Sequence, residues 1–488
     1  MQTVSCPSCG APVQFRSHAS VMAVCEFCRA SVLMDADQLK DIGKMAVALE
    51  DYSPIHIGTA GSHGGRNFTV VGRIQLRYER GMWNEWYLLF DDASAAWLGD
   101  SSGLYTLTLP RQTGSGDPLP GFADVVPGQR YRIGGQAFTA SEKREGECTG
   151  GQGELPFRVG EGWRIRVADF RQGASFLTLD YTDGDVPQVF TGAAVTLPEL
   201  KCQLLREDDQ IKASAGRYRG KLDALDCPSC GSAIKYLPGL ATNLVCPACS
   251  AQLDASRPEA TVLAAGERVA AALTTLQLGA TAKIGADDFT VIGAMVREDE
   301  EATTWTEYLL YSTSTKSSSF FWLVETDDGW SRASVLPSWP EWRSLSADSA
   351  TLEKVKYTKL YDYIATVRFA AGAFNWRVAA GDQVRVYEFE NGQTSLAAEL
   401  TPDELTWSRS TSVAYDQIKA WFGDSLKGSA PAAAAARPLL SSQMKFVWWI
   451  LGLNAIPILF NFGESFWIVI AAIVAVFYPA SYFQGKQK

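Results

Sequence analysis

The chain has 488 residues, more than a single hydrophobic core usually organises, so the sequence predicts several folding units. Hydrophobic residues make up 47% of the chain and charged residues 20%, a composition that excludes a disordered or low-complexity protein. The formal net charge of -10 argues against sequence-independent binding of nucleic acid, because neutralising phosphates requires clustered Lys and Arg.

Residues 1–35 are expected to form a zinc ribbon, because they contain two closely spaced cysteine pairs. The expected ligands are Cys6, Cys9, Cys25 and Cys28. Two residues between thiolates let one turn aim both sulfurs at a single ion, and two such turns complete a tetrahedral shell with no open position. We therefore expect a structural zinc ion. A redox dithiol and an iron–sulfur centre are the weaker alternatives.

The setting of this ribbon favours metal binding over disulfides. No basic and apolar secretory signal lies between Met1 and Cys6, so the soluble part is expected in the cytoplasm, where thiols stay reduced. The charges of residues 1–35 cancel, with Arg16 and Arg29 against Glu26 and Asp35. Without a basic face, the ribbon is expected to be a folding nucleus or a protein contact.

Two further segments complete the first unit. Residues 36–54 are expected to be a helical connector, because apolar residues recur there at helix-like spacing: Leu39, Ile42, Ala46 and Leu49. Residues 55–215 contain short apolar runs bounded by Gly, Asp and Ser turns, which predicts β domain 1, an antiparallel barrel or sandwich. The Gly-rich stretch from Gly58 to Gly65, flanked by His56 and His63, is expected to be a hairpin loop.

Four residues of β domain 1 form a candidate pocket: Trp83, Glu85, Glu154 and Arg158. Trp83 and Glu85 are two residues apart, so in a strand they share a face. If that face is buried, the carboxylate needs a partner, and Arg158 is the expected one. A structural ion pair, a ligand pocket edged by Trp and Glu, and acid–base chemistry are the alternatives.

The whole unit is then repeated. A step of 221 residues carries the first cysteines onto a second expected set of zinc ligands: Cys227, Cys230, Cys246 and Cys249. The expected order is a second ribbon over 220–256, a helical connector over 257–277 and β domain 2 over 278–425. Trp305 and Glu307 repeat the Trp83 and Glu85 pair, with Arg377 as the expected partner of Glu307.

Several motifs occur in both copies: F-T-V-[VI]-G at 68–72 and 289–293, then W-x-E, then W-L, with G-E-L-P-F at 153–157 in the first copy. Together they resemble the bacterial family catalogued as domain of unknown function 4178, which often follows a zinc ribbon. The resemblance covers about residues 50–195 and 275–413 and implies no established activity. It suggests a membrane-maintenance setting, with phage-shock-protein-A-like or spermidine-synthase-like proteins as partners. Ala373 replaces Glu154 in the second copy, so any chemistry of Glu154 would belong to the first.

The C-terminal segment is expected to enter a membrane. Residues 426–443 read as an Ala/Pro linker, and residues 444–484 as a transmembrane hairpin. Between Phe446 and Phe483 the only charge is Glu464, and one helix of that length would exceed a ~30 Å hydrocarbon core. The distribution of lysines around the hairpin predicts that both termini and the soluble domains are cytoplasmic. A re-entrant hairpin and a buried helix pair are the alternatives.

These patterns together predict a mainly β protein without catalytic residues. The histidines are three, and no phosphate loop, dinucleotide fingerprint or nucleophile elbow appears. The leading hypothesis is an adaptor or scaffold with two structural zinc ions, anchored in the cytoplasmic membrane and not an enzyme. The alternative is a small-ligand sensor or enzyme with a pocket in β domain 1. Nucleic-acid binding through the ribbons is the weakest hypothesis.

Overall fold

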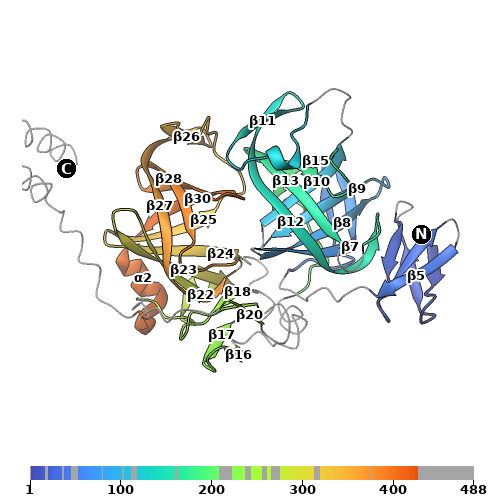
Figure 1. The fold of residues 1–488 in the computed structure, drawn as a ribbon, viewed down its shortest axis with the longest axis horizontal. Helices are drawn as coiled ribbons and strands as arrows, with labels where there is room; N and C mark the ends of the chain where they lie inside the picture. The colour runs from blue at the N-terminus through green and yellow to red at the C-terminus, as the bar shows by residue number, and fades with distance from the viewer. Residues whose placement is uncertain are drawn as a thin grey trace, which may run out of the picture. The chain divides into compact units, whose positions relative to one another are not determined.

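Figure 1 shows the chain in a computed structural model, coloured from the N-terminus to the C-terminus. The structure describes residues 2–16, 20–35, 38–44, 53–79, 81–101, 104–111, 118–159, 163–207, 223–236, 243–254, 261–264, 275–312, 319–374 and 376–426. Within these ranges the protein is mainly β, with two closed barrels in tandem.

Barrel 1 is a ring of eight antiparallel strands, ordered β12-β13-β14-β15-β10-β9-β8-β7, in which β7 pairs back with β12. The strands are β7 (Arg66–Tyr78), β8 (Gly81–Phe90), β9 (Ala95–Ser101), β10 (Leu104–Arg111), β12 (Gln136–Leu155), β13 (Arg164–Gln172), β14 (Ser175–Asp180) and β15 (Gln188–Val195). Two four-stranded meanders therefore meet along two seams. The short strands β6 (Ala60–His63) and β11 (Arg130–Ile133) extend the sheet by pairing with β7 and β12. The hairpin expected around Gly58 to Gly65 is confirmed, because β6 turns into β7 at Gly64 and Gly65.

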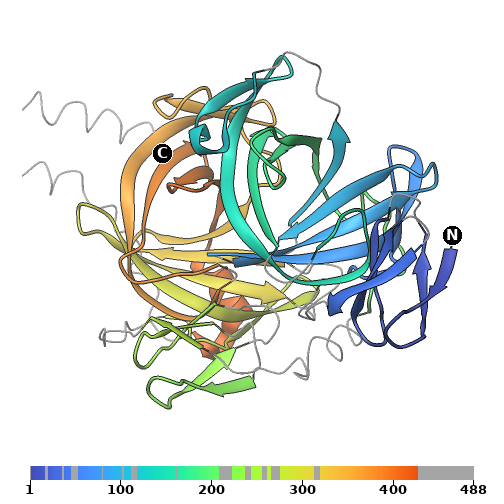
Figure 2. The ribbon, with the colours of Figure 1, turned by 45° about the vertical axis from the view of Figure 1, so that its right-hand side comes forward.

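The long strand β12 closes the barrel. Its first part pairs with β13, its middle pairs with β7, and its last residues pair with the strand β3 (Met22–Val24) of the ribbon. A bulge between Cys148 and Gly150 bends it along the way, and Figure 2 shows the strand curving around the barrel. The family motifs contribute this seam, since Gly72 faces Gly153.

Both glycines of that seam are required by close backbone approach. A Cβ on Gly72 would collide with the carbonyl oxygen of Glu154, and one on Gly153 would collide with that of Val71. Gly153 also has a positive φ of 67°, a conformation that favours glycine. The second copy repeats the arrangement with Gly293 facing Gly372, so these motif residues are explained by barrel closure.

The outward faces of barrel 1 are apolar and covered by flanking segments. Trp86 and Leu88 on β8 pack with Ile55 and Leu200, which precede and follow the barrel. On the other meander, residues of β13 and β14 pack under the segment that contains η1 (Phe122–Asp124) and β11. Because much of the core lies outside the ring, the inward faces are free to carry polar residues.

Ribbon 1 consists of two hairpins, β1 (Gln2–Ser5) with β2 (Pro12–Phe15), and β3 with β4 (Ala30–Asp35). A further strand, β5 (Gln38–Lys44), pairs with β4, so β5, β4, β3 and β12 are neighbours in one sheet. The ribbon is therefore joined to barrel 1 by main-chain hydrogen bonds as well as by sequence.

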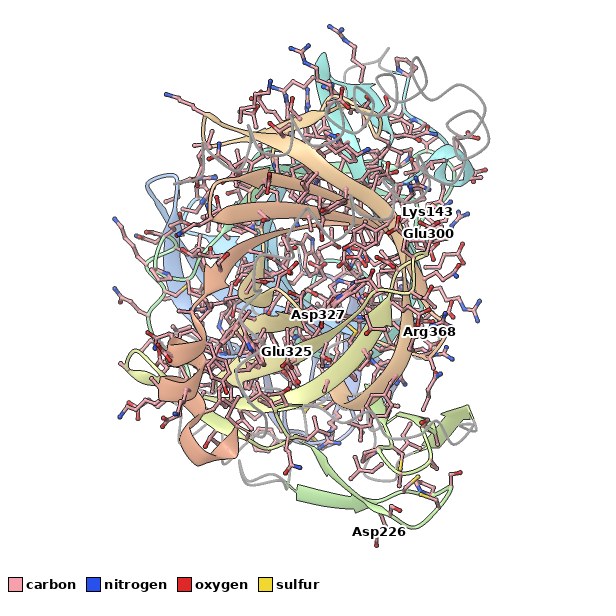
Figure 3. The ribbon with its side chains drawn as sticks, turned by 90° about the vertical axis from the view of Figure 1, so that its left-hand side faces the viewer. Lys143, Asp226, Glu300, Glu325, Asp327 and Arg368 are labelled. Carbon is pink, nitrogen blue, oxygen red and sulfur yellow. The ribbon has the colours of Figure 1, made fainter. Side chains whose placement is uncertain are left out.

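The second copy has the same plan, and Figure 3 looks onto barrel 2, with Glu325 labelled on β24 and Arg368 on β27. Its ring is β22 (Asp287–Glu298), β23 (Thr304–Ser312), β24 (Ser319–Thr326), β25 (Gly329–Val335), β27 (Val355–Phe374), β28 (Gln383–Asn391), β29 (Thr394–Leu400) and β30 (Leu405–Val413). Two strands extend it, β21 (Thr281–Ile284) and β26 (Ser349–Leu352). Ribbon 2 comprises β16 (Asp223–Asp226), β17 (Ala233–Tyr236), β18 (Asn243–Val245), β19 (Gln252–Asp254) and β20 (Thr261–Ala264).

Barrel 2 is followed by a helix that the sequence did not predict. Helix α2 (Tyr415–Phe422) buries Ile418 and Phe422 against the outward face of the barrel, beside Leu276 and Phe289. A short turn of η2 (Gly423–Ser425) follows it. The helix therefore covers a strand face that a flanking loop covers in the first copy.

The helical connectors expected over 36–54 and 257–277 are wrong where the structure describes them. Residues 38–44 form β5 and residues 261–264 form β20, since pairing with the ribbon edge outweighs the apolar spacing. Among the described residues no helix is both long and apolar enough to cross a membrane. The linker and hairpin expected over 426–443 and 444–484 lie outside the described residues, apart from Leu426.

Candidate functional site

The two cysteine tetrads come together as the spacing predicts, and each could hold a metal ion. In ribbon 1 the Sγ atoms of Cys6 and Cys28 are 3.6 Å apart, and those of Cys9 and Cys25 are 3.7 Å apart. The corresponding distances in ribbon 2 are 3.8 and 3.7 Å. Four thiolates around one tetrahedral ion at ~2.3 Å would be separated by about 3.8 Å. The sulfur positions therefore fit a four-coordinate metal site.

Tight turns aim the sulfurs. The amide of Gly10 donates to the carbonyl of Cys6 at 2.8 Å, and Gly10 has a φ of 77°, as expected for a left-handed residue after the pair. The second turn repeats the bond from Arg29 to Cys25, also with a positive φ, although Arg29 is not glycine. Left-handed backbone is unfavourable for a residue with a Cβ, so the fold holds it in place there.

A cavity lies inside barrel 1. Each of the eight strands contributes to its lining: Leu76, Glu85, Trp97, Thr106, Arg144, Asp169, Asp180 and Phe190. Eight-stranded barrels are wide enough to be filled by side chains or to hold one small ligand. In this barrel the lining combines aromatic and ionisable side chains, which is the composition of binding sites.

Trp83 and Glu85 line this cavity together, so the expected common face is confirmed. The indole Nε1 of Trp83 donates to Oε1 of Glu85 at 2.9 Å. Burial raises the pKa of Glu85 to about 7, although the Trp83 hydrogen bond and the charge of Arg144 act in the opposite direction. The carboxyl group therefore titrates near neutral pH, which is typical of functional sites.

The cation near Glu85 is Arg144 on β12, and the expected pairing with Arg158 is wrong. Arg144 forms ion pairs with Asp169 and with Glu142, the latter at 3.1 Å, and its guanidinium lies 4.4 Å from the Trp83 ring. Arg158 lines the cavity but is exposed, and no ion pair joins it to Glu85 among the residues described. The sequence did not point to Arg144, because no copy-two arginine occupies its position.

The cavity wall next to Glu85 also carries aromatic rings, since Trp97 lies on the neighbouring strand β9. The ring of Phe157 stacks against Trp97 at 5.7 Å and against Trp163 at 5.2 Å, and all three line the cavity. The W-L and G-E-L-P-F motifs thus meet here, although they are distant in sequence. In the second copy Trp376 takes the place of Phe157 and contacts Trp322 at 5.3 Å, so the packing survives the change of motif.

Glu154, the fourth residue of the candidate pocket, does not line this cavity. It lies at the junction with ribbon 1 and is 1% exposed. Its carboxylate accepts from the amide of Arg16 at 2.6 Å and from the hydroxyl of Ser20 at 3.0 Å, and the Arg16 guanidinium lies 3.6 Å away. The structure therefore gives Glu154 a position between ribbon and barrel.

Barrel 2 keeps the Trp and Glu pair but supplies a different cation. Trp305 donates to Glu307 at 2.8 Å, and Arg297 lies 3.4 Å from the Glu307 carboxylate. The prediction that Arg377 pairs with Glu307 is wrong, because Arg377 donates to the side chain of Gln252 at 3.0 Å. Both barrels therefore have acidic side chains in the interior, but the neighbouring arginine comes from β12 in barrel 1 and from β22 in barrel 2.

A family model described as Domain of unknown function (DUF4178) matches residues 56–197 and 277–414, which contain the two barrel rings. No curated protein and no solved structure matches the chain.

Proposed function

The chain belongs to the DUF4178 family, whose domain it contains twice, and we propose that it is a non-catalytic binding protein whose first barrel receives a small ligand. The observation that carries this proposal is the cavity inside barrel 1, which is lined by the hydrogen-bonded Trp83 and Glu85 and by the stacked ring of Phe157. A hydrogen-bonded carboxyl and stacked rings in one cavity offer a ligand both orientation and apolar contact.

Catalysis has less support than binding. His56 is occupied by a contact of its Nε2 with the carbonyl of Leu204 at 2.7 Å, and His63 stands at a hairpin turn. Neither histidine is among the residues that line the cavity. Glu154, which the second copy replaces by Ala373, accepts hydrogen bonds from residues of ribbon 1 and does not line the cavity.

A cavity-blocking variant tests the ligand proposal. Thr106→Trp places a large ring inside the barrel, whereas Glu147→Trp adds the same ring at an exposed position of β12. In a thermal-shift screen against small metabolites, ligands that stabilise the wild type and Glu147→Trp should fail to stabilise Thr106→Trp. Equal stabilisation of Thr106→Trp would place the binding site elsewhere.

Within the same proposal the two tetrads hold structural zinc ions. All-thiolate tetrahedral shells favour zinc and leave no position for a substrate, so the metal would stabilise the ribbons. Metal analysis of the purified chain should find two equivalents of zinc, one for each tetrad. Iron in place of zinc, with the visible absorption of an iron–sulfur centre, would contradict this assignment.

We propose further that the protein is an adaptor attached to a membrane. Phe27, between two ligands of ribbon 1, is 72% exposed, and a large apolar side chain at a rigid turn favours contact with another protein. The apolar sequence over 446–483 supports membrane attachment. A chain ending at residue 426 should bind zinc but leave the membrane fraction. Continued membrane association of that chain would exclude the segment as the anchor.

A further inference from the structure

The two barrels can be compared position by position, because strand register fixes which residues correspond. Leu76 pairs across the strands with Trp83, and Arg297 pairs with Trp305, so Leu76 and Arg297 are equivalent. Asp180 lies opposite Val167 and Glu399 lies opposite Val386. The repeat matches those two valines, so Asp180 and Glu399 are equivalent as well.

In barrel 2 the arginine of this set occupies the space between two carboxylates. The Arg297 guanidinium contacts Glu399 at 2.8 and 3.5 Å through its two terminal nitrogens and lies 3.4 Å from Glu307. Arg297 is 6% exposed, so its charge is buried inside the barrel. A third acidic residue, Glu388, is held separately by the hydroxyl of Tyr363 at 2.7 Å.

In barrel 1 the same two carboxylates have no such cation. Glu85 accepts from the Trp83 indole, and Asp180 accepts from the amide of Thr182 at 2.8 Å. Neither forms an ion pair with any residue that the structure describes, since Leu76 replaces the arginine. Arg144 does not substitute for it.

Arg144 pairs with carboxylates other than Glu85 and Asp180. It forms its ion pairs with Asp169, the equivalent of Glu388, and with Glu142. Tyr363 occupies the position in barrel 2 that Arg144 occupies in barrel 1, and its hydroxyl donates to Glu388. The third acidic residue therefore has its own partner in each barrel. Glu85 and Asp180 both line the cavity and are accessible from it.

We infer that barrel 1 binds an organic cation, an ammonium or guanidinium group on an apolar body, with its charge between Glu85 and Asp180 where barrel 2 holds its own Arg297. This inference rests on the proposed ligand-binding function and specifies the ligand class. The second barrel is the internal precedent, because equivalent carboxylates there already bind a guanidinium. The stacked rings of Trp97 and Phe157 would contact the apolar body.

Calorimetric titration of the full chain in detergent tests the inference with four probes that each contain a six-carbon chain: n-hexylguanidinium, n-hexylammonium, n-hexanol and hexanoate. Both cations should bind one site, at least tenfold more tightly than hexanol. Leu76→Arg supplies the cation internally and should abolish cation binding, whereas Leu76→Met should retain it. Conversely, Arg297→Leu should raise the number of cation sites from one to two.

Folding is checked separately, by zinc content and circular dichroism. If Leu76→Arg fails to fold, Glu85→Gln replaces it and should weaken cation binding at least tenfold. Hexanol or hexanoate binding as tightly as the cations would overturn the cation assignment but leave cavity binding intact. Failure of all four probes to bind would overturn both. Cation binding that Leu76→Arg or Glu85→Gln leaves unchanged would place the cation site outside this pair of carboxylates.

Discussion

Replacing Glu85 by Gln should stabilise barrel 1 at alkaline pH and not at acidic pH. The carboxyl group has an ordinary pKa of 4.5, and burial raises it to about 7 in the folded protein. The folded state therefore binds this proton more tightly than the unfolded state. Stability falls as pH rises between the two values, and the full cost applies above the folded pKa.

The size of the effect follows from the shift. At 1.36 kcal/mol per pKa unit, the ionised carboxylate costs about 3 kcal/mol above pH 7. Glutamine keeps an oxygen that can accept from Trp83 but carries no charge. The free energy of unfolding should therefore rise by about 2 to 3 kcal/mol at pH 8 and change by less than about 1 kcal/mol at pH 5.

Hydrogen exchange of peptides from β8 measures this free energy for barrel 1 itself within the full chain. Glu147→Gln removes a carboxylate from an exposed position of β12 and should change neither value. If Glu85→Gln instead lowers stability at both pH values, Glu85 is a structural acceptor and its ionisation does not destabilise the barrel. A stabilising loss of charge would indicate that the carboxylate is retained for binding.

Four further variants test the remaining sites. Cys9→Ser should lower the zinc content from two equivalents to one, measured by metal analysis, while a second chain with Cys230→Ser should behave identically. Glu154→Ala should destabilise the joint between ribbon 1 and barrel 1 by about 2 kcal/mol, because the carboxylate no longer accepts hydrogen bonds from the Arg16 amide and the Ser20 hydroxyl. Hydrogen exchange of the β3 amides would report the loss, and unchanged protection would argue against the joint. Gly72→Ala should prevent barrel closure, which circular dichroism would reveal as lost β structure.

Comparison of the two copies also explains why Ala373 can replace Glu154. Glu154 pairs in register with Ala23, and Ala373 pairs with Leu244, so a small residue faces a larger one in both copies. The second copy is 0% exposed at Ala373 and fills the junction with apolar volume instead of an ion pair. The loss of the glutamate is thus a different way of packing the same contact.

The repeat, the cysteine tetrads, the antiparallel β class and the shared face of Trp83 and Glu85 were all predictable from the sequence. Each of these depends on local spacing, which a strand or a tight turn converts directly into geometry. The three-dimensional fold was needed to show that the β domains are closed barrels and that the residues after each ribbon extend the ribbon sheet as a strand. Those outcomes depend on pairing between distant segments.

The candidate pocket was likewise only partly predictable from the sequence. Tertiary structure assigned Arg144 and excluded Arg158 as the neighbouring charge of Glu85, and it moved Glu154 to the ribbon. Arg144 and Glu85 lie on strands that are not hydrogen-bonded to each other, and the face that Arg144 presents depends on the path of β12. A side chain's face alternates with each residue, so a bulge in a long strand reverses it, and sequence spacing across that bulge carries no information about partners.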